Sequence, residues 1–153
     1  MTTAYVGIGS NLKDPRALVL QAFNELDGLP QTRVVKKSSL YRSAPVGHAD
    51  QPDFINAVAQ LETGLAAERL LAELQEIEAR HGRERSFPNA PRTLDLDLLL
   101  FGNAVLDTPS LKLPHPRMHE RAFVLKPLLE IAPQLPFLAQ LDSCKHQEVE
   151  RID

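Results

Sequence analysis

The 153-residue chain has no tryptophan and one cysteine, and aromatic residues make up 5% of it. The lone cysteine, Cys144, excludes an intramolecular disulfide and a cysteine-based metal site. The sequence has no apolar run of membrane-spanning length, and its first residues lack the charged and apolar regions of a secretory signal. Its formal net charge is only −3, so it has no overall attraction to nucleic acid or anionic membranes. We therefore expect a cytoplasmic protein that binds neither.

The rest of the composition is typical of a globular protein, with 43% hydrophobic and 24% charged residues. This length suits one domain, residues 1–153, with a single core, and we expect a monomer. Because the total charge is small, any polyanionic ligand must be held by a local basic patch.

Apolar periodicity predicts strands and helices in alternation. The segment TAYVGIGS, residues 3–10, is expected to be a strand that runs into a turn at its small residues. A helix follows, with Asp14 as its N-cap, Pro15 in its first turn and an end near Gly28. Its expected core-facing side chains are Leu18, Ala22, Phe23 and Leu26.

The remaining segments continue the same pattern. Residues 32–43 and 54–63 read as strands, residues 66–82 as a helix ending at Gly82, and residues 93–101 as a fourth main strand. The segment GNAVL leads into a further short strand, and a last helix starts near residue 119 and is disturbed at Pro127. The order β-α-β-β-α-β predicts a ferredoxin-like α+β sandwich, an antiparallel sheet with helices packed on one face.

Two carboxylates interrupt the leucines of the fourth strand. Residues two apart in a strand share a face, so Asp95 and Asp97 point together while Leu94, Leu96 and Leu98 point into the opposite layer. Like charges this close repel unless a cation neutralises them. Oxygen ligands favour magnesium, with phosphate oxygens completing the coordination shell. The alternative is a sheet face that is simply open to water.

Arginines gather on the approach to this strand, at positions 80, 83, 85 and 92. An arginine cluster at a helix end is by itself typical of a solvated C-terminus. Beside a carboxylate pair it indicates clamps for a polyphosphate. The cluster extends into one of two long irregular segments, residues 43–53 and 83–92, which are typical either of functional loops or of variable surface.

Histidines and glycines offer two further readings. His115 and His119 are four apart, but Pro116 disfavours a regular helix there and no third zinc ligand is evident, so a phosphate-facing role for His115 and Arg121 is more coherent. The turn GIGSN lacks the third glycine of a dinucleotide loop and the Lys-Ser/Thr of a P-loop. It predicts a tight turn, so any ATP site here is of another type.

Together these segments resemble one enzyme family over nearly the whole chain. YVGIGSNL, SSLYRSAPVG, QPDFINAV, PRTLDLDLLLFGN and LPHPRMHERAFVLKPLLEIAP are similar to 6-hydroxymethyl-7,8-dihydropterin pyrophosphokinases, with PRTLDLDLLLFGN the most specific. The resemblance implies a ferredoxin-like fold and transfer of pyrophosphate from ATP to the hydroxymethyl group of a dihydropterin in folate biosynthesis, with release of AMP.

The resemblance also implies roles position by position. Asp95 and Asp97 match the carboxylates that hold two Mg2+ ions, and with Arg83 and Arg92 they form the implied catalytic set. The implied nucleotide-binding set is Gln75, Glu78, Arg85, Leu98, His115 and Arg121. The implied pterin-binding set is Ser43, Ala44, Pro45, Val46, Phe54, Asn56 and Phe123.

The chain departs from the family pattern at three positions: Asn89 stands where a tryptophan is usual, and Ser110 and Pro116 stand where an arginine and a tyrosine are sometimes seen. Two other function classes stay open on the residues alone. A ferredoxin-like nucleic-acid-binding module is disfavoured by 5% aromatics and carboxylates on the candidate face. Another magnesium-dependent phosphotransferase or nuclease would use the same carboxylate pair, and its reaction products would differ.

Overall fold

The computed structural model describes residues 1–12, 14–45, 51–82 and 94–153. Predicted residues Val46, Arg83, Arg85 and Arg92, and also Asn89, lie outside this part of the chain. Within it, no helix is both long enough and apolar enough to cross a membrane.

The strands are β1 (Thr2–Ser10), β2 (Thr32–Lys37), β3 (Tyr41–Ser43), β4 (Phe54–Thr63), β5 (Asp95–Phe101), β6 (Leu106–Asp107), β7 (Lys112–Leu113) and β8 (Val149–Arg151). The helices are α1 (Pro15–Asp27), α2 (Ala67–Arg80), α3 (Ala122–Ile131), α4 (Leu138–Ser143) and the short 3-10 helix η1 (Met118–Glu120).

The main sheet is antiparallel, with the strand order β5-β1-β4-β3-β8 and β2 also paired with β4. The antiparallel α+β fold and the order of its main elements are as predicted. Strands β6 and β7 form a separate hairpin. Strand β5 lies at the end of this order, so one of its edges pairs with β1 and the other faces away from the sheet.

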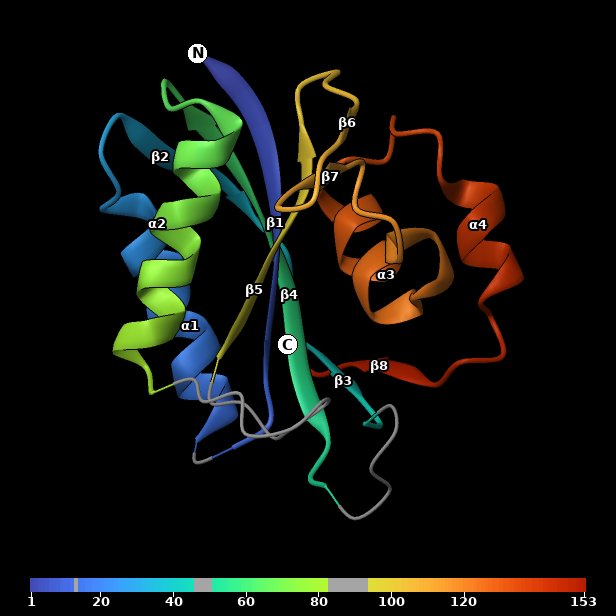
Figure 1. Cartoon of the computed structure of the whole chain (residues 1–153). Coiled ribbons are helices and arrows are strands. Elements are labelled where there is room, and N and C mark those ends of the chain that lie inside the picture. Colours follow the sequence, from blue (N-terminus) through green and yellow to red (C-terminus); the bar gives the residue numbers. More distant parts are fainter. Residues whose placement is uncertain (13, 46–50, 83–93) are drawn as a thin grey trace.

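Helices cover both faces of the sheet, whereas the sequence predicted one covered face. Figure 1 shows α1 and α2 on one side of the strands and α3 and α4 on the other. Strand β4 explains why two layers are needed: Ala57, Ala59 and Leu61 pack into the core under α1 and α2, and Val58 packs into a second core with Leu125 and its neighbours in α3. Both faces of the central strands are apolar, so each requires a cover.

The predicted second strand, residues 32–43, is divided into β2 and β3. The break lies at Ser38, whose backbone N–H donates to the Val58 carbonyl and whose hydroxyl accepts from the Val58 N–H, both at 2.9 Å. A side-chain oxygen thus replaces the backbone acceptor that a continuous ladder would supply. The division sets β3, which leads to Ser43, opposite the first residues of β4.

Two predicted helices differ in detail from those observed. In α1 the buried residue of the first turns is Val19, while Leu18 is only half-buried, so the core-facing stripe is shifted by one residue. Helix α3 continues through Pro127. An interior proline costs roughly 3 kcal/mol, but Pro127 is buried and Leu125 and Leu128 are fully buried beside it, and this packing offsets the cost.

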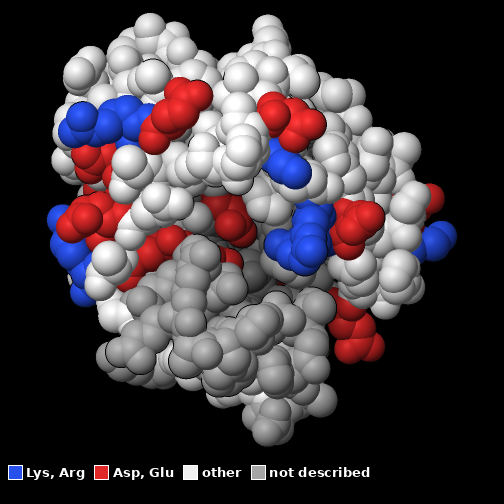
Figure 2. All heavy atoms as spheres, in the orientation of Figure 1, with Lys and Arg blue, Asp and Glu red and all other residues white. Residues whose placement is uncertain are grey.

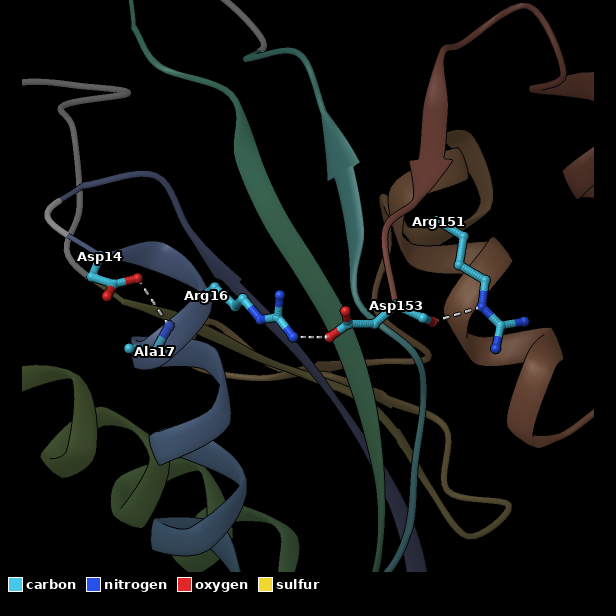
Figure 3. Close-up of polar contacts among 5 residues, drawn as sticks. All are labelled: Asp14, Arg16, Ala17, Arg151 and Asp153. Carbon is cyan, nitrogen blue, oxygen red and sulfur yellow. Dashed lines mark hydrogen bonds and ion pairs between the residues drawn. The ribbon is translucent and has the colours of Figure 1, made fainter.

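The end of α2 is close to the prediction. His81 is its C-cap, and Gly82 follows with a left-handed φ of 75°, which glycine adopts without strain. The N-cap of α1 is as predicted, since Asp14 accepts a hydrogen bond from the Ala17 N–H at 3.3 Å (Figure 3).

The last residues return from β8 to α1. Asp153 accepts a hydrogen bond from Arg16 at 2.8 Å through its side chain and one from Arg151 at 2.8 Å through its backbone carbonyl (Figure 3). Ile152 packs against the core under α1 and α2. Residues 149–153 therefore connect the outer edge of the sheet to its first helix.

Candidate active site

A cavity of about 150 Å3 lies on the α3 face of the sheet. It adjoins the core that Val58 and its neighbours form on the same face. Strands β1, β4 and β5 form its floor, and the start of α3 forms one wall. Eight residues that the sequence predicted for the site line it: Ser43, Ala44, Phe54, Asn56, Asp95, Asp97, Arg121 and Phe123. The fold thus brings together residues that lie up to 80 positions apart in the sequence.

Two glycines of β1 give this floor its depth. Gly9 pairs with Asn56 on one side and with Asp95 on the other, and Gly7 pairs in the same way with Val58 and Asp97. A Cβ at Gly9 would lie 3.4 Å from Asn56 Oδ1 and 3.8 Å from Phe54 Cδ1. Directly paired residues share a face of an antiparallel sheet, so a larger residue at Gly9 would fill the cavity floor.

Sequence reasoning missed Gly7 and Gly9 as site residues. It treated GIGSN as a turn, whereas Gly7 and Gly9 belong to the strand β1. A usable signal was present, because glycines two apart in a strand leave one face without side chains. Their place in the site also depends on the sheet order, because β1 lies between β5, which carries Asp95 and Asp97, and β4, which carries Asn56.

Asn56 is held in a defined orientation. It is 4% exposed, and its Nδ2 donates a 2.7 Å hydrogen bond to the Ser43 hydroxyl, which is also buried. The bond uses one amide proton and turns Oδ1 toward the space above Gly9. A flat heterocycle lying on this floor would meet a preoriented amide at its edge.

Aromatic rings stand at two sides of the cavity. Phe54 begins β4 and Phe123 lies in the first turn of α3. Both side chains are half-buried, and Phe123 also packs against the core under α3. The guanidinium carbon of Arg121 lies 5.5 Å from the centroid of the Phe123 ring, a cation–π distance. This contact keeps a positive charge at the wall of the cavity that the two carboxylates also line.

Asp95 and Asp97 occupy the cavity as the period of the strand predicted. Both are half-buried and line it, while Leu94, Leu96 and Leu98 are buried in the core under α1 and α2. Two carboxylates with access to a cavity provide hard oxygen donors and leave coordination positions for water or phosphate, which is the pattern that Mg2+ prefers. The donor set therefore fits a divalent cation shared with a phosphorylated ligand.

A second cavity, of about 260 Å3, lies along the outward edge of β5. It is bounded by α2 through Leu71 and by residues 109–112, which lead into β7. Asp97, Leu98 and His115 are its predicted site residues, and Ser110 and Pro116 also line it. Asp97 lines both cavities, so the carboxylate pair stands at their boundary.

His115 is fixed to β5, and its surroundings disfavour the protonated ring. Its backbone N–H donates to the Leu99 carbonyl at 2.9 Å, and its Nδ1 accepts from the Arg117 N–H at 3.2 Å. Burial is the main cause that lowers the pKa of His115 below its ordinary value of 6.5, with Arg121 as a second cause and Asp95 opposing them. A neutral ring whose Nδ1 is an acceptor carries its proton on Nε2, where it can donate to a phosphate oxygen.

The other predicted site residues that the structure describes line neither cavity. Gln75 is exposed on α2, and Pro45 is half-buried after β3. Glu78 is 3% exposed and accepts a 2.8 Å hydrogen bond from the Leu96 N–H. In the described part of the chain, no cluster of three or more His, Cys, Asp or Glu side chains could hold a metal, so the His115 and His119 pair gains no third zinc ligand there.

Charge is unevenly distributed over the face that Figure 2 shows. Acidic side chains lie at its middle and on both sides of it, and basic side chains lie at its left edge and to the right of the middle. A surface that carries both signs of charge suits a cation together with an anionic ligand better than it suits a long polyanion.

Comparison with known proteins identifies a family. The family model for 7,8-dihydro-6-hydroxymethylpterin-pyrophosphokinase matches residues 5–133. A 2-amino-4-hydroxy-6-hydroxymethyldihydropteridine pyrophosphokinase from Pseudomonas aeruginosa is 49% identical over 156 residues, which cover 97% of this chain and 95% of the relative. The enzyme of the same name from Haemophilus influenzae is 47% identical, with 88% of this chain and 84% of the relative covered.

Solved structures support the fold. A Plasmodium falciparum HPPK-DHPS triple mutant superposes with a TM-score of 0.72 over 93% of this chain at 12% identity. An HPPK-DHPS solved in complex with substrates gives a TM-score of 0.68 at 13% identity. This chain spans 43% of each of those longer chains.

Proposed function

The chain belongs to the 7,8-dihydro-6-hydroxymethylpterin-pyrophosphokinase family, and we propose that it transfers pyrophosphate with the pterin in the first cavity, ATP in the second and Asp95 and Asp97 between them. The activity itself follows from the family: a pyrophosphokinase that moves the pyrophosphoryl group of ATP to hydroxymethyldihydropterin in folate synthesis. What we propose is how this chain's residues carry it out.

The observation that carries this arrangement is the position of Asp97, which lines both cavities. A transfer between two substrates needs their reacting atoms side by side, with the developing charge neutralised where they meet. A carboxylate pair at that boundary supports such a meeting point, because it can hold a cation between the two ligands.

The first cavity suits the pterin. Its bicyclic ring would lie over Gly9, between the rings of Phe54 and Phe123, with Asn56 at its edge. Backbone groups of residues 43–46 would complete the hydrogen bonds to that edge; Ser43 and Ala44 line the cavity, and Val46 lies outside the described residues.

The second cavity suits the nucleotide. It follows the outward edge of β5, where the backbone of Leu98 can pair with an adenine edge in the way that a strand partner would. His115 and Arg121 would face the phosphates. The rest of the proposed nucleotide and phosphate contacts are Gln75, Arg83, Arg85 and Arg92. The resemblance also implies Glu78, but this side chain is 3% exposed and accepts the Leu96 N–H, so we propose an indirect role for it.

Asp95 and Asp97 would hold Mg2+, with two ions proposed, and the metal would neutralise the triphosphate and draw its oxygens into position. The pterin hydroxymethyl oxygen would attack the β-phosphorus and transfer its proton to solvent water. The bond from that phosphorus to the bridging oxygen of the α-phosphate breaks, and AMP leaves with the bonding electrons. Positively charged Arg121, with Arg83 and Arg92, would stabilise the charge that spreads over the transferred group.

Product analysis tests this function directly. ATP labelled in its adenine should give AMP only when 6-hydroxymethyl-7,8-dihydropterin is present, and the pterin product should carry both transferred phosphates. Formation of ADP would indicate a monophosphoryl kinase, and hydrolysis of nucleic acid would indicate a nuclease that uses the same carboxylates. Either result would contradict the proposal.

The same proposal treats residues 1–153 as one catalytic domain that acts as a monomer in the cytoplasm. ATP as co-substrate suits a cytoplasmic location. A sedimentation-equilibrium measurement that gives a mass well above 17.0 kDa would contradict the monomer.

A further inference from the structure

Glu78 is a buried carboxylate that neither cavity explains. It lies near the end of α2, between the buried Ile77 and the exposed Ala79, and is itself 3% exposed. A buried carboxylate is costly unless hydrogen bonds compensate it. Its Oε2 accepts the backbone N–H of Leu96 at 2.8 Å, a charge-assisted bond of ordinary length.

The donor of this bond is the residue between Asp95 and Asp97. Strand β5 pairs with β1 on one edge, and the Leu96 N–H points to the opposite edge, toward α2. An edge strand held on one side only can twist or slip locally. This strand already carries an irregularity, because Val6 pairs with Leu98 and Tyr5 pairs with Leu100.

Among the described residues, two hydrogen bonds hold the outward edge of β5. Glu78 holds it at Leu96, and the backbone of His115 holds it at the Leu99 carbonyl. The first point lies directly between the two aspartates, whose like charges favour separation. A fixed amide at Leu96 keeps both carboxylates directed to the same side of the strand.

We infer that Glu78 is a positioning residue: its carboxylate holds the Leu96 amide and thereby sets the direction of Asp95 and Asp97 for binding a divalent cation. This inference rests on the proposed function, because that function gives the two aspartates their metal. Glu78 does not act as a third ligand, since the described residues contain no three-member cluster that could hold a metal.

Mn2+ affinity tests the inference without turnover. The measurement is electron paramagnetic resonance of Mn2+ with a non-hydrolysable ATP analogue. Glu78→Ala should weaken Mn2+ binding about 10-fold or more, as loss of a group that orients metal ligands does. Glu78→Gln keeps an acceptor oxygen at the same reach and should recover most of the affinity, within about 3-fold of wild type.

Two variants of α2 serve as controls. Glu76→Ala removes an exposed charge from the same helix and should leave Mn2+ affinity unchanged. Leu70→Ala destabilises the core beneath the sheet without touching β5 polar groups, so it should lower the melting temperature but not the affinity. If Glu78→Ala does not fold, Glu78→Met keeps the packing volume and supports the same comparison.

Hydrogen exchange gives a second readout. The Leu96 amide should exchange faster in Glu78→Ala than in wild type, with neighbouring core amides little changed. In turnover, kcat should fall while the KM for the pterin stays constant. Equal Mn2+ affinity in Glu78→Ala and wild type would overturn the inference, as would a loss confined to ATP affinity, which would indicate direct nucleotide contact.

Failure of the proposed function would give a different result. A wild-type protein that binds Mn2+ but forms no AMP would contradict pyrophosphoryl transfer by this chain, and the Mn2+ and exchange comparisons among the Glu78 variants would still decide the positioning role. A wild-type protein with no Mn2+ affinity would overturn both.

Discussion

Asn56 donates a 2.7 Å hydrogen bond from its amide to the hydroxyl of Ser43, and both side chains are buried beside the first cavity. The bond joins β4 to β3 across paired strands and leaves the amide oxygen directed over Gly9. A buried amide that is preoriented in this way can hydrogen-bond to the edge of a ligand without losing further conformational entropy on binding.

Replacing Ser43 by alanine should therefore weaken pterin binding. The loss of one net hydrogen bond is worth about 1 kcal/mol, which corresponds to roughly a 5-fold rise in the pterin dissociation constant. Isothermal titration with the pterin measures it. Ser38→Ala is a matched control, because it removes another buried hydroxyl bonded to β4, at Val58, away from the cavity. A similar loss of affinity in both variants would indicate a general effect of destabilisation.

Phe54→Ala should weaken pterin binding about 10-fold, because stacking on an aromatic face is lost, and should leave ATP affinity nearly unchanged. Titration with each ligand separately measures the two affinities. Phe54→Leu retains apolar area without the ring face and should recover little of the pterin affinity. Equal effects on both ligands would mean that Phe54 acts only through packing.

Asp97→Ala should reduce kcat by about 100-fold or more at saturating Mg2+, because it removes half of the proposed cation donors at the meeting point of the substrates. Steady-state AMP release measures the rate, and circular dichroism checks the fold. Asp142→Ala is the control, since this side chain is 77% exposed on α4 and lines neither cavity. Near-normal turnover by Asp97→Ala would refute the metal-binding role.

The Glu130 carboxylate attaches α3, which carries Phe123, to the sheet. It accepts hydrogen bonds from the Tyr41 hydroxyl at 2.7 Å and from the Ser39 hydroxyl at 2.9 Å. Partial burial would raise the pKa of Glu130, but these hydrogen bonds outweigh it and lower the pKa below the ordinary value of 4.5. Burial and the same carboxylate raise the pKa of Tyr41. Both directions agree with a bond that favours ionised Glu130 and protonated Tyr41.

The pH dependence of stability follows from the lowered pKa. As the pH falls below 4.5, the unfolded chain takes up a proton at Glu130 before the folded protein does, so acidification favours unfolding. We expect Glu130→Gln to cost about 1 kcal/mol at neutral pH after solvent screening, and this difference from wild type should shrink as the pH falls through the folded pKa. Urea unfolding of both proteins between about pH 3 and pH 7, at intervals of about 0.5 pH units, measures this difference in the free energy of unfolding. A difference that does not vary with pH would contradict the ionised bond.

Local patterns in the sequence determined much of this protein. Period-two alternation directed Asp95 and Asp97 away from three leucines, and the structure has that division. The same rule places Phe54 and Asn56, two residues apart in β4, on one face, and both line the first cavity. Capping chemistry located α1 at Asp14 and Pro15. These features depend on neighbouring residues alone, which is why the sequence reveals them.

Tertiary structure decided what local patterns could not. The break at Ser38 depends on a hydrogen bond to Val58, twenty positions away, and the helix through Pro127 persists because buried neighbours hold it. The site roles of Gly7 and Gly9 come from the position of β1 between β4 and β5. The link from Glu78 to Leu96 requires α2 to pack beside an edge strand. Each of these depends on contacts between distant segments, whose free energy is gained only when the whole sheet and its two layers assemble.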